Sequence, residues 1–253
     1  MRKLFQSFII IFFLFKCLFS QSFHINYEEL GDNCFYNLDY EKSFEMYEKG
    51  LKNNPDDYNL NWKMARLLVN LGEVPGNEKK NYFSEAEKYA NKSIKLNPNR
   101  SEGYTFKSAA IGNLAFYSGN KEKIIAANTM IMLLKKAIQI NPKDHIAYSI
   151  LGSIERMLAG ISWFERTIGK IIYSISIPEG SYNDAIKYFL KAIEIDNKLI
   201  RHHYELGLTY FDMKDYQKAK IEFEKALKCP IQLKADYRRL ELIKEKLDII
   251  SNR

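Results

Sequence analysis

One helical pattern occurs twice in this chain, 34 residues apart. Residues 182–192 read Tyr-Asn-Asp-Ala-Ile-Lys-Tyr-Phe-Leu-Lys-Ala, and residues 216–226 read Tyr-Gln-Lys-Ala-Lys-Ile-Glu-Phe-Glu-Lys-Ala. The first tyrosine, both alanines and the phenylalanine recur without a gap. Helix-turn-helix units of this period stack into a superhelix, because each unit can bury its apolar face only against its neighbours. The duplication therefore predicts an all-helical repeat protein.

The spacing and the residue types resemble the tetratricopeptide repeat. In such units small residues stand where helix backbones approach closely, and Gly31, Ser43 and Gly50 fit those places in the first unit. A proline then ends the second helix, as at Pro55. The resemblance implies an all-α tetratricopeptide-repeat α-solenoid of about five units over residues 23–253. The amphipathic residues 233–250 are expected to form a C-terminal capping helix.

Three units are longer than the template. The second carries extra residues at 74–81, and the third carries about ten around 118–121, which predicts a lengthened helix over 121–140. The fourth is stretched most, by an inserted helix and loop at 160–180. The fifth unit, from His203 to Pro230, is nearly ideal.

The first 22 residues differ from the rest. Arg2 and Lys3 precede an apolar run, 4–15, which is shorter than the roughly 20 residues of a membrane-spanning helix. Small residues follow at 20–22, so the segment is predicted to be a signal peptide cleaved after Ser22 or Ser20, and the protein to be periplasmic or secreted. The alternative is an uncleaved membrane anchor over 4–19.

The composition narrows the function classes. The net charge is +7, but the basic residues are scattered among acidic neighbours, so a solvated surface is favoured and no nucleic-acid partner is expected. Beyond the N-terminal segment, Cys34 and Cys229 lie in the first and last units. The ends of a solenoid lie far apart, so these two cysteines are not expected to form a disulfide.

Motifs for catalysis are not found. The sequence has no glycine-rich phosphate loop, nucleophile elbow or paired-carboxylate pattern, so no catalytic residue, cofactor or enzymatic activity is predicted. His202 and His203 are adjacent and diverge by about 100° on a helix, which favours core histidines over metal ligands. His24 and His145 are expected to stand alone at helix entrances, and no metal site is predicted.

Two surfaces are candidates for partner binding. The concave face of such solenoids, made by the first helix of each unit, normally holds a peptide or helix. The residues mapped to it are Lys63, Asn70, Arg156, Arg201, Tyr204 and Phe211. The second candidate is the inserted segment 160–173, whose apolar residues exceed what one packed face requires. These include Trp163, Phe164, Ile168 and Tyr173. The segment either exposes an aromatic docking surface or folds back to fill the superhelix groove.

A narrower resemblance appears in the last two units. Residues 141–144 leading to Leu151-Gly152, then Ala159-Gly-Ile-Ser-Trp-Phe-Glu-Arg166 and Cys229-Pro-Ile, resemble the regulator of microtubule dynamics protein family. The resemblance covers roughly residues 62–247. It implies a non-enzymatic helical-repeat protein that associates with cytoskeletal or membrane partners.

Two hypotheses follow. In the first, the chain is a scaffold that binds a protein or peptide in its concave groove, within an exported or membrane-associated complex. In the second, it is a lipid- or membrane-binding module that uses the apolar segment 160–173. The first rests on the repeats and the second on the inserted segment together with the apolar N-terminus.

Overall fold

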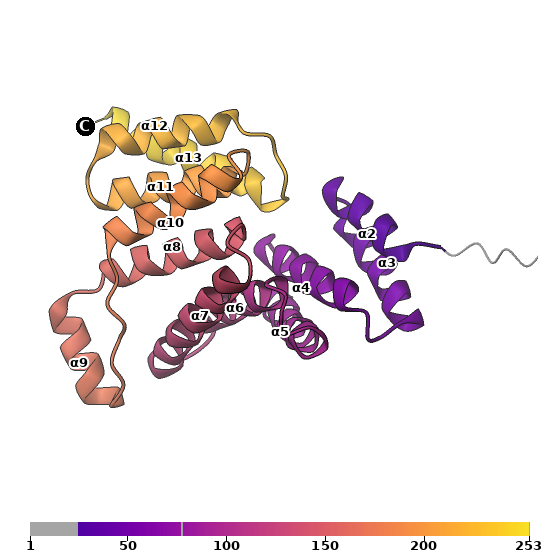
Figure 1. Ribbon diagram of the computed structural model, residues 1–253. Helices are drawn as coiled ribbons and strands as arrows, with labels where there is room; N and C mark the ends of the chain where they lie inside the picture. Colours follow the sequence, from indigo (N-terminus) through magenta and orange to yellow (C-terminus); the bar gives the residue numbers. More distant parts are fainter. Residues whose placement is uncertain (1–24, 77, 253) are drawn as a thin grey trace, which may run out of the picture.

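The chain folds into stacked pairs of antiparallel helices. The structure, a computed structural model, describes residues 25–76 and 78–252, and in these residues it contains twelve helices and no strand (Figure 1). The predicted signal segment lies outside the described residues. The helices are α2 (Tyr27–Tyr36), α3 (Tyr40–Asn53), α4 (Tyr58–Glu73), α5 (Lys79–Leu96), α6 (Glu102–Ala115), α7 (Asn120–Ile140), α8 (His145–Ala159), α9 (Trp163–Tyr173), α10 (Tyr182–Ile195), α11 (Ile200–Asp212), α12 (Tyr216–Lys228) and α13 (Ala235–Ser251).

Ten of these helices form five units. The pairs α2–α3, α4–α5, α6–α7, α8–α10 and α11–α12 pack along each other, and α13 packs on α11 and α12. The predicted α-solenoid of about five units with a C-terminal capping helix is therefore confirmed. The lengthened helix predicted at 121–140 is α7, which spans 21 residues. In Figure 1 the helices follow a curved stack. The helix α9, which comes after α8 and before α10 in the chain, stands apart from this stack.

The first and fifth units turn between their helices in the same way. Asp39 and Asp215 cap α3 and α12, each accepting a hydrogen bond from the backbone N–H three residues on. The residue before each cap, Leu38 or Lys214, has a left-handed backbone, with φ of 62° and 64°. The short side-chain acceptor satisfies an otherwise unpaired N–H of the helix start, so both units reverse direction within a few residues.

Glycine and aromatic residues face each other inside the units. A Cβ on Gly207 would lie 2.6 Å from the ring of Phe223, and a Cβ on Gly31 would meet the ring of Tyr47 in the same way. Phe223 and Tyr47 are fully buried. The small residue on the first helix thus makes room for the large one on the second, as the repeat pattern predicted.

The two ends of the superhelix meet. Arg239 of α13 pairs with Glu73 at the end of α4, at 2.6 Å, and Lys234 pairs with Glu41 of α3, at 3.2 Å. Figure 1 shows the turn between α12 and α13 directed toward the first unit. The expectation that the ends lie far apart is therefore wrong for this turn, because the curvature of the stack returns it to α3. Cys34 and Cys229 of the described chain are both free thiols.

Candidate partner-binding surface

The concave face contains two adjoining cavities. The first, of about 370 Å³, is lined mainly by the first helices of the units, α2, α4, α6, α8 and α11. The second, of about 480 Å³, lies between α6, α7 and α8 and is mostly apolar. Ala109, Ile150 and Arg201 line both cavities. The inner face is therefore a continuous hollow with a polar, aromatic part and an apolar part.

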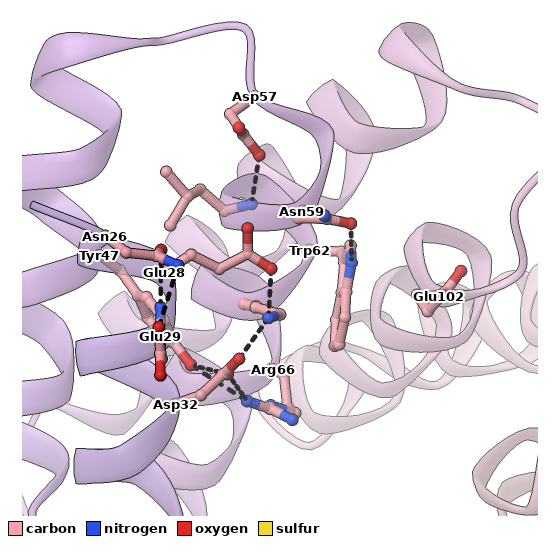
Figure 2. Close-up of polar contacts among 12 residues, drawn as sticks. Asn26, Glu28, Glu29, Asp32, Tyr47, Asp57, Asn59, Trp62, Arg66 and Glu102 are labelled. Atoms are coloured by element: carbon pink, nitrogen blue, oxygen red, sulfur yellow. Dashed lines mark hydrogen bonds and ion pairs between the residues drawn. The ribbon is translucent and has the colours of Figure 1, made fainter. Parts of the chain in front are cut away.

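A charged cluster holds the first two units together (Figure 2). Asp32 accepts hydrogen bonds from Tyr47 at 2.6 Å and from Arg66 at 3.0 Å, and Lys63 pairs with both Asp32 and Glu28. Burial alone would raise the pKa of Asp32. The hydrogen bonds from Lys63 and Tyr47 and the neighbouring cations outweigh burial and lower this pKa. The Asp32 carboxylate therefore stays charged at neutral pH, and its contacts hold α2 against α4.

Aromatic rings form the wall of the first cavity. The guanidinium of Arg66 lies 3.9 Å from the centroid of the Phe35 ring and 5.2 Å from that of Trp62. Trp62 stacks on Phe106 of the next unit, with centroids 6.0 Å apart. The Nε atom of Arg66 has no hydrogen-bond partner among the described residues. Tyr36, which hydrogen-bonds to Arg66, is 65% exposed at this wall. A planar or aromatic guest group could stack here.

Of the predicted groove residues, Asn70, Arg156 and Arg201 line the two concave cavities, and most of the six make internal contacts. Lys63 is ion-paired and largely buried, and the Asn70 amide donates to the Arg66 carbonyl at 2.8 Å. Arg156 bridges to Glu205 and Asp212 of α11. Burial would lower the pKa of Arg156, but these two carboxylates raise it. These polar residues therefore shape the wall rather than offer free charges.

Tyr204 and Phe211 lie on α11 and line neither concave cavity. Both are partly buried against the core of the last unit, where Tyr204 packs near the Phe223 ring and Phe211 meets Tyr216 edge to face. Phe211 is also covered by the ammonium group of Lys246 in α13, 4.4 Å from its centroid. The six predicted residues thus come from the first helices α4, α8 and α11, and neither concave cavity is lined by all six.

Glu73 is a hub that sequence reasoning missed. Its carboxylate accepts from Arg201 at 3.3 Å and from Arg239 at 2.6 Å, and Arg239 also pairs with the buried Asp236. Burial would raise the pKa of Glu73, but the two guanidinium groups outweigh burial and lower it. No local pattern announces this contact, because its members come from the second and fifth units and the capping helix.

Two histidines face each other at 2.9 Å, Nδ1 of His145 to Nε2 of His202. The expectation that His145 stands alone is therefore wrong. Burial, helped by His145 and Arg201, lowers the pKa of His202 to about 2, so this ring is neutral. His203 is buried and contacts Glu222 at 2.7 Å. Within the described residues no group of three His, Cys, Asp or Glu side chains is placed to hold a metal ion.

The inserted helix α9 exposes the residues predicted for it. Trp163, Phe164 and Ile168 are exposed, Trp163 by 78%, and Tyr173 is partly buried. Ile171 and Ile172 are exposed on the same side. The opposite side of α9 carries Gly169, the buried residue of this helix, and faces Ile177 of the loop that follows. Helix α9 itself does not fill the groove, since no α9 residue lines either concave cavity, whereas Ile161 just before it lines the second one.

Arg166 attaches α9 to the body. Its guanidinium donates to the carbonyl oxygens of Leu158 and of Pro178, on the two sides of the insertion. Ser162 and Glu165 form a capping box at the start of the helix. The adjacent Glu165 and Arg166 thus have separate partners. The polar face of α9 is thereby turned inward and the apolar face outward.

The comparisons with known proteins agree with this architecture. A family model described as regulator of microtubule dynamics protein 1–3 matches residues 29–251. The chain belongs to this family. Regulator of microtubule dynamics protein 1 of Bos taurus is 28% identical over 185 residues, which cover 72% of this chain and 58% of the bovine protein. The Mus musculus protein of the same name is 29% identical, with 72% of this chain and 60% of the mouse protein covered.

The chain spans about three fifths of these curated mammalian relatives. Among solved structures, a thermophilic TPR protein of Thermus thermophilus aligns with a TM-score of 0.66 and 19% identity, covering 88% of this chain and 97% of that one. This likeness supports the tetratricopeptide fold. None of the helices that the structure describes is long and apolar enough to cross a membrane.

Proposed function

We propose that this chain is a non-enzymatic scaffold that binds a protein or peptide segment along its concave face, in an exported or membrane-associated complex. A tetratricopeptide-like helical scaffold is itself suited to protein–protein interaction, and its relatives are of non-catalytic scaffold type. The single observation that carries the proposal is the continuous hollow formed by the two concave cavities. It offers both stacking rings and an apolar floor to a bound segment.

Exposed rings at the hollow identify the residues to test. Tyr36 is 65% exposed at the first cavity and Phe116 is 75% exposed at the second. Aromatic side chains at a concave surface commonly act as anchors for a partner. They are better targets than Arg156 or Arg201, because reversing those charges would also break internal ion pairs.

Affinity purification of the full chain from its own cells tests the proposal. Tyr36→Asp and Phe116→Asp together should remove the co-purifying protein. The matched control is Leu190→Asp on α10, which is half exposed and lines neither concave cavity. The partner should stay bound to the control. Retention of the same partner by the double variant would remove the concave face from consideration.

The compartment is a separate part of the proposal. It rests on the predicted signal segment in residues 1–22, which the structure does not describe. Determination of the N-terminal residue of the mature protein tests it. A start at Gln21 or Phe23 is expected for a released, exported protein, whereas an intact apolar run would favour the anchored alternative.

A second candidate function, membrane association through α9, is favoured by one specific observation. Five large apolar side chains of this helix point away from the body, and Lys170 flanks them. Interfacial helices combine such an apolar face with flanking cations that attract anionic lipids. The full chain should float with vesicles of phosphatidylserine and phosphatidylcholine, and Trp163→Ser with Ile171→Ser should abolish flotation. Failure of the unchanged protein to float would rule this candidate out.

A further inference from the structure

The concave face of the first two units is already in contact with a segment of the chain itself. Gln232 and Leu233, from the turn before α13, line the first cavity together with rings of α2 and α4. Leu233 packs against the core cluster to which Phe35 and Tyr40 belong. An apolar residue from the C-terminal end therefore occupies the surface that the first units offer to the hollow.

Polar contacts fix this segment in one register. The backbone N–H of Lys234 donates to the Tyr40 hydroxyl at 3.2 Å, and its ammonium group pairs with Glu41 and lies 4.9 Å from the centroid of the Tyr40 ring. Arg239, just over one helical turn later, pairs with Glu73. The segment is thus recognised by an aromatic ring and two carboxylates, which is a complementary arrangement for an apolar residue followed by two cations.

The segment is shaped independently of the site that it contacts. The buried carboxylate of Asp236 accepts from the backbone N–H groups of Gln232 and Leu233, at 3.1 and 2.9 Å, and from Arg239. Farther along α13, Ile243 is fully buried in the core of the last unit. The capping role of α13 therefore rests on its later residues, while its first turn and the preceding residues face the first two units.

We propose that the concave face of the first two units is a binding site for a short basic segment that carries an apolar residue before its lysine, and that residues 232–234 fill this site until a partner segment of the same kind displaces them. The inference rests on the proposed function, since it names the kind of segment that the concave face accepts. The Lys234–Glu41 pair lies at the rim, where Glu41 is largely exposed. Exposed pairs of this kind contribute little to stability, and the buried Arg239–Glu73 pair stays in place, so residues 232–234 can be released without unfolding the stack.

A synthetic peptide with the sequence of residues 231–240 is the probe. The receiving protein is the full chain with Leu233→Ser and Lys234→Ser, which truncates the two side chains that occupy the site and leaves the Arg239–Glu73 pair, Ile243 and the core of the last unit in place. An occupied site lowers apparent affinity by its free fraction, so this variant should bind the labelled peptide at least about tenfold more tightly than the unchanged protein. Equal, weak binding by both proteins would overturn the proposal.

Exchanging the charges of the Lys234–Glu41 pair shows whether tighter binding by the double variant comes from this site. Adding Glu41→Lys to the variant should weaken binding of the same peptide, and a peptide with glutamate at the position of Lys234 should recover it. Glu41 is on the surface, so its substitution leaves the fold intact. No recovery would contradict the assigned register. If the peptide binds but no cellular partner is captured, the binding site is supported and the proposed scaffold function is contradicted.

Discussion

The helices α12 and α9 are both amphipathic, yet they place their apolar faces in opposite directions. In α12, Ala219, Phe223 and Ala226 are fully buried. In α9, Trp163 and Ile171 are 78% and 74% exposed, and the buried residue is a glycine. Apolar periodicity alone therefore does not decide which face a helix buries in this chain.

The difference comes from the repeat. Phe223 of α12 has a partner on α11, since Gly207 leaves room for its ring, so register and burial are set together at this position. The helix α9 has no counterpart in the other units, and its orientation is set by the clamp of Arg166 on the carbonyl oxygens of Leu158 and Pro178. A face that the fold leaves uncovered is available for contact with something outside the chain.

Truncation of one phenylalanine in each helix should separate the two most strongly. Phe223→Ala removes a fully buried ring and should lower the free energy of unfolding by about 3–5 kcal/mol. Phe164→Ala removes an exposed ring and should change it by less than about 0.5 kcal/mol. Urea unfolding of both variants measures the difference. Equal losses would mean that α9 is packed as tightly as α12.

Charge placement provides the second contrast. Glu73→Gln leaves Arg201 and Arg239 without their shared carboxylate and should lower the free energy of unfolding by about 3 kcal/mol. Glu194→Gln removes only an exposed pair and should lower it by about 0–1 kcal/mol.

The pKa of Glu73 is lower in the folded state than in the unfolded chain. Its contribution is thus present above about pH 4.3 and is lost as pH falls through the folded pKa. Unfolding curves at pH 7 and pH 3 check both statements.

Overpacking tests the repeat register itself. Ala219→Leu inserts three carbons into a fully buried position and should cost about 1–3 kcal/mol. The neighbouring Lys220→Leu lies on the exposed side of α12 and should change stability by less than about 0.5 kcal/mol. A melting temperature that Ala219→Leu leaves unchanged would show that the register is wrong.

The neutral His202 predicts an effect that appears only as the pH is lowered. The unfolded chain takes up a proton at this residue below about pH 6.5, but the folded chain does not until about pH 2. Stability should therefore fall as pH drops below 6.5, by up to about 1.4 kcal/mol per pH unit. The loss between pH 6.5 and 5 should be shallower in His202→Leu. Parallel curves for the two proteins would mean that His202 is protonated in the folded state.

The solenoid could be predicted from the sequence because each repeat unit is defined by residues that lie close together in the chain. The copies at 182–192 and 216–226 set the register, and α7 appears where the extra residues of the third unit predicted a long helix. The contacts that shape the concave face were not predictable in this way. Glu73 meets Arg239 across 166 positions, and the His145–His202 contact joins two units. Such pairs depend on the curvature of the whole stack.

The candidate surfaces were predicted only in part, because their positions follow from the local repeat whereas their contacts depend on distant residues. Template positions located Arg156 and Arg201 on first helices, but the carboxylates that engage them come from α11 and α4. The apolar excess of 160–173 was visible in the sequence, whereas its outward direction depends on where Arg166 finds carbonyl oxygens. Exposed Tyr36 and Phe116 carried no sequence signal beyond being aromatic.

Photo-crosslinking of the full chain tests most directly whether the concave face receives the partner. A photoreactive phenylalanine analogue is placed at Tyr36 in the concave hollow, at Leu190 on α10, or at Trp163 on α9, all of which are exposed. The account predicts a protein adduct from position 36 and none from position 190, while lipid contact would label position 163. An adduct from position 190 with none from position 36 would contradict it.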